Sequence, residues 1–247
     1  MSSTRARPSA ESGPVAALEG VRVPKLTTST SPQVPALVDF VIWGRAAHSR
    51  NDATHVYTVH MGRIIVEQIV SADGLAQDSE AGMKFMTVAE PDDADDDQLR
   101  MLKGVDAIVF GRTTYGMFAD YWPDADPERY PVAVPIEALP KHVVSSTLEV
   151  APWADGEIAV EAGDGVESLR RLRKRYAGDL IIWGSLTLTD ALFRAGEVDV
   201  LRLRIVPTLI GAGRGPTPED LPLTGITLVG TRVFAGGQVT LEYALER

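Results

Sequence analysis

The sequence contains no cysteine, and this absence excludes several kinds of chemistry. A chain without thiols can form no disulfide, no thiolate nucleophile and no cysteine-ligated metal site. Histidine is also scarce: of the four histidines, His48, His55 and His60 lie in the first 60 residues, and only His142 lies further along. We therefore expect neither a histidine-based triad nor a metal centre in the main part of the chain.

Long apolar runs are missing as well. No segment approaches the ~20 apolar residues that a membrane-spanning helix needs, and no apolar core follows the N-terminal arginines as in a secretory signal. The chain of 247 residues is 45% hydrophobic, and its mean hydropathy is close to zero. These values and the lack of long apolar runs are typical of a globular protein that does not bind membranes. The lack of thiols fits a reducing compartment, so we expect a cytoplasmic location.

Positive charge is in short supply, since the formal net charge is −10. Residues 1–60 carry six Lys/Arg and four Asp/Glu, whereas residues 61–247 carry 18 and 30. An acidic domain of this kind argues against sequence-independent binding to nucleic acid, which depends on neutralising phosphates. A small phosphate-bearing ligand can still bind, because a distant acidic surface is screened at physiological ionic strength.

The first 60 residues differ in composition from the rest. They are rich in Ser, Thr, Pro and Ala and show no long periodic segment, so we expect a disordered N-terminal extension. A chain start assigned too far upstream is an alternative, because Met61 directly precedes the first convincing strand. An apolar patch at residues 36–43 could dock on the domain or on a partner. We place the folded domain at residues 62–247.

Two buried strands each run through a glycine directly into a helix. The first covers residues 107–110 and is followed by Gly111, and the second covers residues 179–183 and is followed by Gly184. Such a turn directs unpaired backbone N–H groups and the positive end of the helix dipole at one point, which suits an anion. In a parallel sheet both turns would lie at the carboxyl edge, where ligands bind. Arg112 adds a guanidinium suited to phosphate.

The remaining pattern alternates strands with helices and ends in strands only. We predict strands over residues 63–70, 107–110, 141–145, 157–161, 179–183, 199–206, 226–234 and 238–245. We predict helices over residues 98–103, 113–119, 166–176 and 186–195, with 123–140 and 207–222 as loops. This order indicates an α/β fold with a mixed, mostly parallel sheet, helices on both faces and an antiparallel C-terminal hairpin.

Two charged stretches have both a structural and a functional interpretation. Asp95, Asp96 and Asp97 could bind a metal, but we favour carboxylates that complement a helix dipole. The basic residues between 170 and 175 are interpreted as the solvated face of a helix that Asp164 caps.

Six of these segments, in this order, resemble the dihydrofolate-reductase-like family. They match best the branch related to the C-terminal reductase domain of the bifunctional riboflavin-biosynthesis deaminase-reductases. The segments cover residues 69–74, 107–115, 143–148, 179–188, 207–213 and 228–234. Over residues 62–247 the resemblance implies a three-layer α/β/α reductase that uses NADPH and is often a homodimer. The Trp-Leu-Pro-acid pattern of true dihydrofolate reductases is absent from residues 75–100, so the resemblance does not fix the substrate.

By position, the resemblance implies cofactor contacts at residues that follow the strands. They are Gly111, Arg112 and Thr113 for phosphate, Ser145 and Ser146 for the adenosine side with its 2′-phosphate, Gly184, Ser185 and Leu186 for pyrophosphate, and Gly211 and Gly213 at the border of the pocket. These residue types suit such contacts, because glycine permits close backbone approach, while hydroxyls and arginine donate hydrogen bonds.

Reduction of a C=N or C=O bond also needs a proton, and two carboxylates are candidates to supply it. Asp73 lies in the loop after the first strand, where it could donate the proton, position water or simply form the turn. Glu67 lies in an otherwise apolar strand. A buried carboxylate there would need a partner or a raised pKa, and a solvated place at the sheet edge is the alternative.

The function expected from these features is an NADPH-dependent reductase that transfers a hydride to a small pteridine-like or ribosylaminopyrimidine-like heterocycle. One alternative is a reductase of another carbonyl or imine, and another is an NADPH-binding protein without turnover, such as a sensor or interaction module. The fold does not separate these functions, because function resides in the site. No metal, nucleic acid or membrane is expected as a partner.

Overall fold

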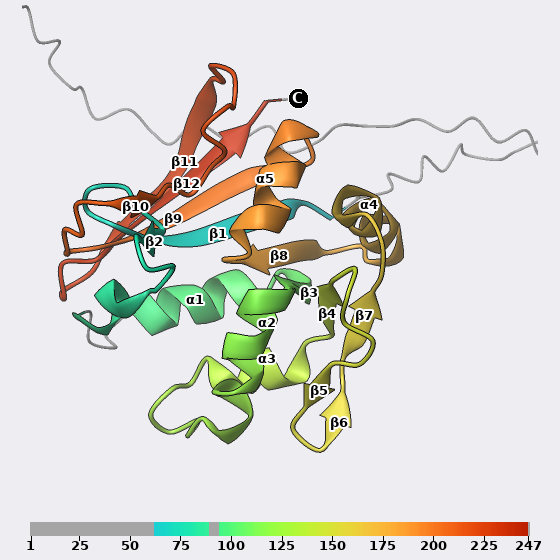
Figure 1. Ribbon diagram of the computed structural model, residues 1–247. Helices are drawn as coiled ribbons and strands as arrows, with labels where there is room; N and C mark the ends of the chain where they lie inside the picture. The colour runs from blue at the N-terminus through green and yellow to red at the C-terminus, as the bar shows by residue number, and fades with distance from the viewer. Residues whose placement is uncertain (1–61, 89–93, 247) are drawn as a thin grey trace, which may run out of the picture. The chain divides into compact units, whose positions relative to one another are not determined.

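Eight strands form the central sheet of the computed structural model, which describes residues 62–88 and 94–246 (Figure 1). In chain order they are β1 (Ile64–Ser71), β3 (Val105–Gly111), β4 (Lys141–Val144), β7 (Ala159–Glu161), β8 (Asp179–Trp183), β9 (Val200–Val206), β11 (Ile226–Val233) and β12 (Val239–Leu245). Their spatial order is β11, β12, β9, β1, β8, β3, β4 and β7. From β9 to β7 all neighbours pair in parallel, whereas β12 runs antiparallel to both β9 and β11. The expected mixed, mostly parallel sheet with an antiparallel C-terminal hairpin is therefore confirmed.

The central strands are buried on both faces. In β1, β3 and β8, Ile64, Ile108 and Ile181 are completely shielded from solvent. Strands in this position form near-continuous apolar runs instead of alternating apolar and polar residues. That is why the sequence pattern predicts these three strands well.

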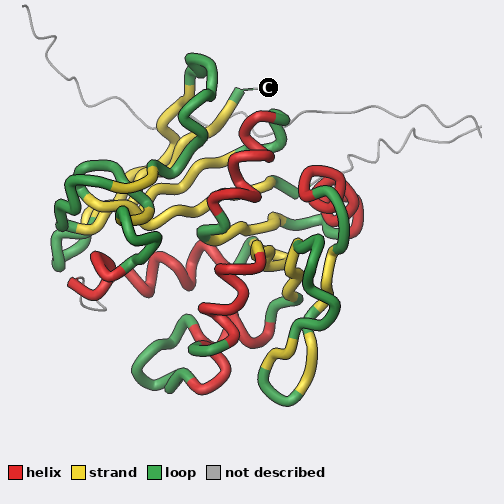
Figure 2. Tube along the Cα trace, in the orientation of Figure 1, coloured by secondary structure: helices red, strands yellow, loops and turns green. Residues whose placement is uncertain are grey.

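Helices lie on both sides of this sheet (Figures 1 and 2). Among the described residues the α-helices are α1 (Ala94–Leu102), α2 (Arg112–Ala119), α3 (Ala133–Ala138), α4 (Gly165–Arg175) and α5 (Leu186–Arg194). Leu102 of α1 and Tyr115 of α2 pack into the core of one face, together with α3. Leu169 of α4 and Leu192 of α5 pack into the core of the other. The expected three layers are confirmed.

α4 shows how local sequence sets a helix boundary. The Asp164 carboxylate accepts the backbone N–H of Glu167 at 3.0 Å, so the predicted N-cap is confirmed. The interpretation of the basic run as a solvated face is wrong for one residue. Arg173 is buried and pairs with Asp199 at 2.8 Å, which ties the helix to the start of β9.

The expectation of a loop over residues 123–140 is wrong in part. This stretch contains α3, and a 3₁₀ turn, η2 (Trp122–Asp124), begins just before it. Pro135 lies in the first turn of α3, where its missing N–H would have no helical acceptor anyway. The sequence also misses two pairs of two-residue strands, because so short a strand shows no periodicity. They are β2 (Gln77–Asp78) with β10 (Gly213–Arg214), and β5 (Pro152–Trp153) with β6 (Gly156–Glu157). The predicted strand over residues 157–161 overlaps β6 only at Glu157, and the structure divides it between β6 and β7.

Residues 1–61 lie outside the described residues, and with them the expected extension, the apolar patch and three of the four histidines. Within residues 62–88 and 94–246, no helix combines the length and apolarity needed to cross a bilayer. The same residues contain no group of three or more His, Asp or Glu side chains placed to hold a metal ion.

Candidate functional site

The two glycine turns lie side by side at the carboxyl edge of the sheet. β3 and β8 are parallel neighbours, so Gly111 and Gly184 leave the sheet at the same edge. The backbone N–H of Gly111 donates to Oγ of Ser185 at 2.7 Å, and the N–H of Ser185 donates to Oγ1 of Thr114 at 2.9 Å. The predicted meeting of the two turns is confirmed, and direct hydrogen bonds join them.

The close contact between the turns explains why each contains a glycine. A Cβ atom on Gly184 would lie 3.1 Å from Oγ1 of Thr114, and one on Gly111 would lie 3.2 Å from Cβ of Ser185. Gly184 and Ser185 both have φ near +55°, which is uncommon for a residue with a side chain. The Ser185 hydroxyl helps to hold this conformation by donating to the Trp183 carbonyl at 2.9 Å.

α5 begins directly after this turn and leaves backbone donors unpaired. The N–H groups of Leu186 and Thr187 have no acceptor within the described part of the chain, as expected where no side chain caps the helix. Ser185, in contrast, joins the turns through its N–H, which donates to Thr114, and through its hydroxyl oxygen, which accepts the Gly111 N–H. An anion at this point would meet the two free N–H groups and the positive end of the helix dipole.

Arg112 is the first residue of α2 and starts beside the same turns. Its side chain is exposed and has no ion pair or hydrogen bond with any residue that the structure describes. Most other arginines of the domain are paired; Arg194, for example, lies 2.7 Å from Asp220. Thr113 is exposed next to it. A free guanidinium next to an uncapped helix start is suited to bind a phosphate.

The two serines after β4 have different surroundings. β4 pairs in parallel with β3, so both serines follow the same edge of the sheet. Ser145 is buried, and its hydroxyl accepts the N–H groups of Thr147 at 3.2 Å and Leu148 at 3.0 Å. Ser146 is exposed. Ser145 therefore shapes the turn, whereas Ser146 is the one of the pair that a ligand can reach.

Asp73 and Gly211, predicted separately, are in direct contact. The Asp73 carboxylate accepts the N–H of Gly211 at 2.7 Å and that of Ile210 at 3.2 Å. A hydrogen bond from Ser71, followed by these backbone donors, lowers the pKa of Asp73 below its ordinary value. An ionised carboxylate is a poor proton donor, so this environment favours the turn-forming interpretation of Asp73.

Gly213 lies further along the loop that contains Gly211 and packs against the backbone of the loop after β1. It belongs to β10, which pairs with β2 opposite Asp78. A Cβ atom on Gly213 would lie 1.9 Å from the carbonyl oxygen of Gln77, so no other residue fits there without moving the backbone. The role that the structure shows for Gly213 is to let these two loops approach each other.

Glu67 is buried inside the protein, and the solvated alternative for it is wrong. One carboxylate oxygen pairs with the guanidinium of Arg202 on β9, and the other accepts the side-chain N–H of Gln98 at 2.9 Å. Arg202 is itself 1% exposed and also pairs with Asp97 and, at 2.9 Å, with Glu242. A buried carboxylate needs such partners. Its role as a proton donor stays a prediction.

The acidic start of α1 belongs to the same buried network. Asp95, Asp96 and Asp97 lie in the first turn of the helix, as the dipole interpretation predicts. Asp97, however, is not solvated, because it pairs with Arg202 and, at 2.5 Å, with Arg232 of β11. α1 is thus fastened to the sheet by ionic contacts in addition to its apolar residues.

Sequence reasoning missed Arg202, although a signal was present. Arg202 and Arg204 alternate with leucine and isoleucine along β9, and alternate residues of a strand face the same side. A single acid, Glu67, stands in the neighbouring strand β1. Two unusual charges of opposite sign in adjacent buried strands are a reason to expect an ion pair.

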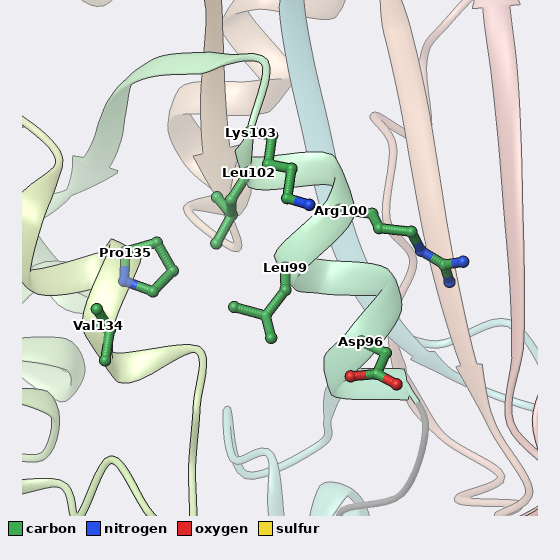
Figure 3. Close-up of a pocket in the computed structure, with 7 residues that line it drawn as sticks. All are labelled: Asp96, Leu99, Arg100, Leu102, Lys103, Val134 and Pro135. Carbon is green, nitrogen blue, oxygen red and sulfur yellow. The ribbon is translucent and has the colours of Figure 1, made fainter.

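Two cavities in the described residues lie away from the glycine turns. The first, of about 520 Å³, is lined by Asp96, Leu99, Arg100, Leu102, Lys103, Val134 and Pro135. Figure 3 shows α1 on one side of it and α3 on the other, with Leu99 and Leu102 between Pro135 and the polar residues of the helix. The second, of about 330 Å³, opens beside Arg202, Asp97 and Glu242. Neither contains a residue predicted to bind the cofactor.

The comparisons with known proteins agree with this architecture. Residues 63–240 match the sequence model of the family described as the RibD C-terminal domain. The uncharacterized protein YyaP of Bacillus subtilis is 27% identical over 188 residues, which are 73% of this chain and 94% of that protein.

Three solved structures share the fold at low identity. A putative riboflavin biosynthesis protein from Shewanella sp. PV-4 has a TM-score of 0.61 and 21% identity, over 75% of this chain and 99% of that one. The Thermotoga maritima diaminohydroxyphosphoribosylaminopyrimidine deaminase/5-amino-6-(5-phosphoribosylamino)uracil reductase has a TM-score of 0.53 and 15% identity, over 75% and 57%. Dihydrofolate reductase from Enterococcus faecalis, complexed with NADP(H), has a TM-score of 0.50 and 14% identity, over 76% and 98%. The match over residues 63–240 shows that this chain belongs to the RibD C-terminal domain family, and its fold is that of the dihydrofolate-reductase-like proteins.

Proposed function

We propose that this protein is a reductase that transfers a hydride from NADPH to a small heterocyclic substrate of the pteridine or ribosylaminopyrimidine type. The observation that carries the proposal is the joined pair of turns at Gly111 and Gly184, with the unpaired Arg112 beside them. Membership of the family supports the substrate type, since the T. maritima relative is named as a ribosylaminopyrimidine reductase. The NADP(H) complex of the E. faecalis enzyme supports the cofactor.

The residues at this edge fit a dinucleotide with several phosphates. The N–H groups of Leu186 and Thr187 would donate to pyrophosphate oxygens, because they lie at the positive end of α5. Arg112 and the exposed Ser146 would hold the phosphate of the adenosine side. When bound, the cofactor supplies the hydride, and the protein supplies orientation and electrostatics.

The cofactor supplies the hydride, so the proton needed for the reduction must come from another source. Asp73 has a lowered pKa and binds the backbone of the 210–211 loop, so it positions that loop and leaves the delivery of the proton to solvent water. Glu67 stays the second candidate, although its carboxylate is bonded to Arg202 and Gln98. We further propose that the protein is a homodimer in the cytoplasm.

The deciding experiment has two steps. Purified full-length protein is first titrated with NADPH and NADH, and we expect tighter binding of NADPH. NADPH oxidation is then followed with 7,8-dihydrofolate, with 5-amino-6-(5-phosphoribosylamino)uracil and with a panel of simple carbonyls and imines. Turnover of one of the two heterocycles supports the proposal. Binding of NADPH without any turnover would favour a sensor or interaction module, and no binding of NADPH would refute both.

A further inference from the structure

Trp183 carries a hydrogen-bond donor that has no partner in the described part of the chain. It is the last residue of β8, directly before Gly184, and only 6% of it is exposed. Its indole N–H is buried and has no acceptor within residues 62–88 and 94–246. Buried donors are almost always paired, because an unpaired one loses its water without compensation. A tryptophan in this state at the edge of a ligand site points to a ligand that completes the bond.

The side chain belongs to the sheet face that α1 and α2 cover. Trp183 is in register with Glu67 of β1, so both side chains lie on that face. Its ring is stacked on Phe118 of α2 at 5.3 Å and lies 6.4 Å from Phe110 of β3. Phe118 and Trp183 form a stacked aromatic pair, with Phe110 tilted and fully buried behind them, and a stacked aromatic pair beside the joined turns suits a planar heterocycle.

Acceptors on Glu67, the residue in register with Trp183, and on the Trp183 backbone already have donors. Both carboxylate oxygens of Glu67 accept donors from other residues. The Trp183 carbonyl accepts a hydrogen bond from the Ser185 hydroxyl, so this acceptor already has a donor other than the indole. Trp153 provides the contrast, because its indole N–H donates to the Glu137 carboxylate at 2.7 Å. Among the described residues, one buried indole is therefore paired, and the other, next to the proposed site, has no acceptor.

We propose that the indole N–H of Trp183 is a substrate-recognition donor that binds a ring carbonyl oxygen of the heterocycle. A neutral donor beside an aromatic pair matches a neutral acceptor, whereas a phosphate would favour the charged and exposed groups around Arg112. This assignment rests on the proposed function and adds a chemical requirement to it, namely a substrate with an oxo group on the ring.

The test compares two variants with the same chemical change. Trp183→Phe removes the unpaired N–H, and Trp153→Phe removes the paired one. With the heterocycle that the wild type reduces, we expect Trp183→Phe to raise KM about 3- to 10-fold at an unchanged kcat, as for a neutral hydrogen bond lost from substrate binding. The Kd for NADPH should not change. Trp153→Phe should leave KM unchanged but lower Tm more than Trp183→Phe does, because it leaves Glu137 without its donor.

A second readout uses the wild-type protein. The Trp183 indole signal in a ¹H–¹⁵N spectrum is identified by its loss in Trp183→Phe, and it should shift when 5-amino-6-(5-phosphoribosylamino)uracil or 7,8-dihydrofolate is added to the NADP⁺ complex. An unchanged KM and an unmoved signal would overturn the assignment while the reductase function stands. A shift caused by NADP⁺ alone would assign the donor to the cofactor and overturn it too. A wild type that reduces neither heterocycle would overturn the proposed function, and this assignment with it.

Discussion

Arg112 differs from most arginines of the described domain in having no carboxylate partner. Arg63, for example, lies 2.6 Å from Asp179, and Arg214 lies 2.5 Å from Asp190. An arginine at an exposed helix start can pair with an acid of the same surface at little cost. The absence of such an acid within residues 62–88 and 94–246 leaves the guanidinium available to a ligand anion.

Replacement of Arg112 tests this availability directly. Arg112→Ala should weaken NADPH binding by about 10- to 150-fold, the loss expected for a charge-assisted hydrogen bond. Binding of NADH should change far less, because it lacks the 2′-phosphate. Isothermal titration of both nucleotides measures the two effects. Arg171→Ala, at an exposed position of α4, is the control and should leave both affinities unchanged. Equal NADPH affinity in Arg112→Ala and the wild type would contradict the phosphate contact.

Residue identity predicts a potential contact better than it predicts a role. Gly111, Gly184 and Arg112 were identified from their place after buried strands, and the structure brings them together. The partner of Glu67 could not be identified in the same way, because Arg202 is 135 positions further along the chain. Such a pair is decided by strand order, and strand order follows from the tertiary fold.

At the level of the element, two loops at the edge of the sheet depend on each other. The loop after β1 contributes Asp73 and β2, and the loop after β9 contributes Gly211 and β10. The Asp73 carboxylate and the short β2–β10 pair join them across the ends of neighbouring strands. Substitution of Asp73 should therefore change the shape of the site more than it changes the stability of the protein.

Two substitutions of Asp73 separate positioning from proton transfer. Asp73→Ala removes the acceptor for the Ile210 and Gly211 N–H groups and should lower kcat/KM about tenfold, as for one lost hydrogen bond to a charged group. Asp73→Asn keeps an acceptor oxygen and should restore most of the activity. NADPH oxidation across a range of pH values measures both. If Asp73→Asn were as inactive as Asp73→Ala, the carboxyl group itself would be needed, and it would return as the proton donor.

Elements with a clear period are predicted well from the sequence, and short elements are not. The strands of the central sheet and the helices α4 and α5 follow the pattern of apolar residues within a few positions. α3 contains Pro135 and lies between Pro131 and Pro140, so the sequence predicts a loop there, and β2, β5, β6 and β10 have only two residues each. These last elements form because the tertiary structure brings their backbones together, which local sequence does not encode.

At the level of the whole molecule, His142 should make stability depend on pH. It is buried on β4, with Nδ1 at 3.1 Å from Glu161 and Nε2 at 2.8 Å from the Tyr176 hydroxyl. Burial lowers the pKa of His142 below its ordinary 6.5, although Glu161 opposes the shift. The unfolded chain therefore takes up a proton near pH 6.5 that the folded chain takes up only at lower pH.

The free energy of unfolding should accordingly fall as pH drops below 6.5, and it should not depend on this group above that value. Urea unfolding at a series of pH values measures the slope. His142→Gln removes the titrating group and should flatten the curve in this window. Identical slopes for the variant and the wild type would assign the acid sensitivity to other groups.

The domain assignment also makes a prediction for the whole chain. The family match covers residues 63–240, so a chain of residues 61–247 should fold and bind NADPH like the full-length protein. Thermal unfolding and nucleotide titration of both chains measure this. A shortened chain that fails to fold would show that residues 1–60 contribute to folding. A shortened chain that folds but loses its affinity for NADPH would show that they contribute to the site.

The hydroxyl of Ser185 has a consequence for any molecule that occupies this edge. A single oxygen atom holds the end of β3 and the end of β8, so the contacts made by the two halves of an elongated ligand are mechanically coupled. Fragments that each cover one half should therefore bind with positive cooperativity, since the first to arrive stiffens the framework that the second needs.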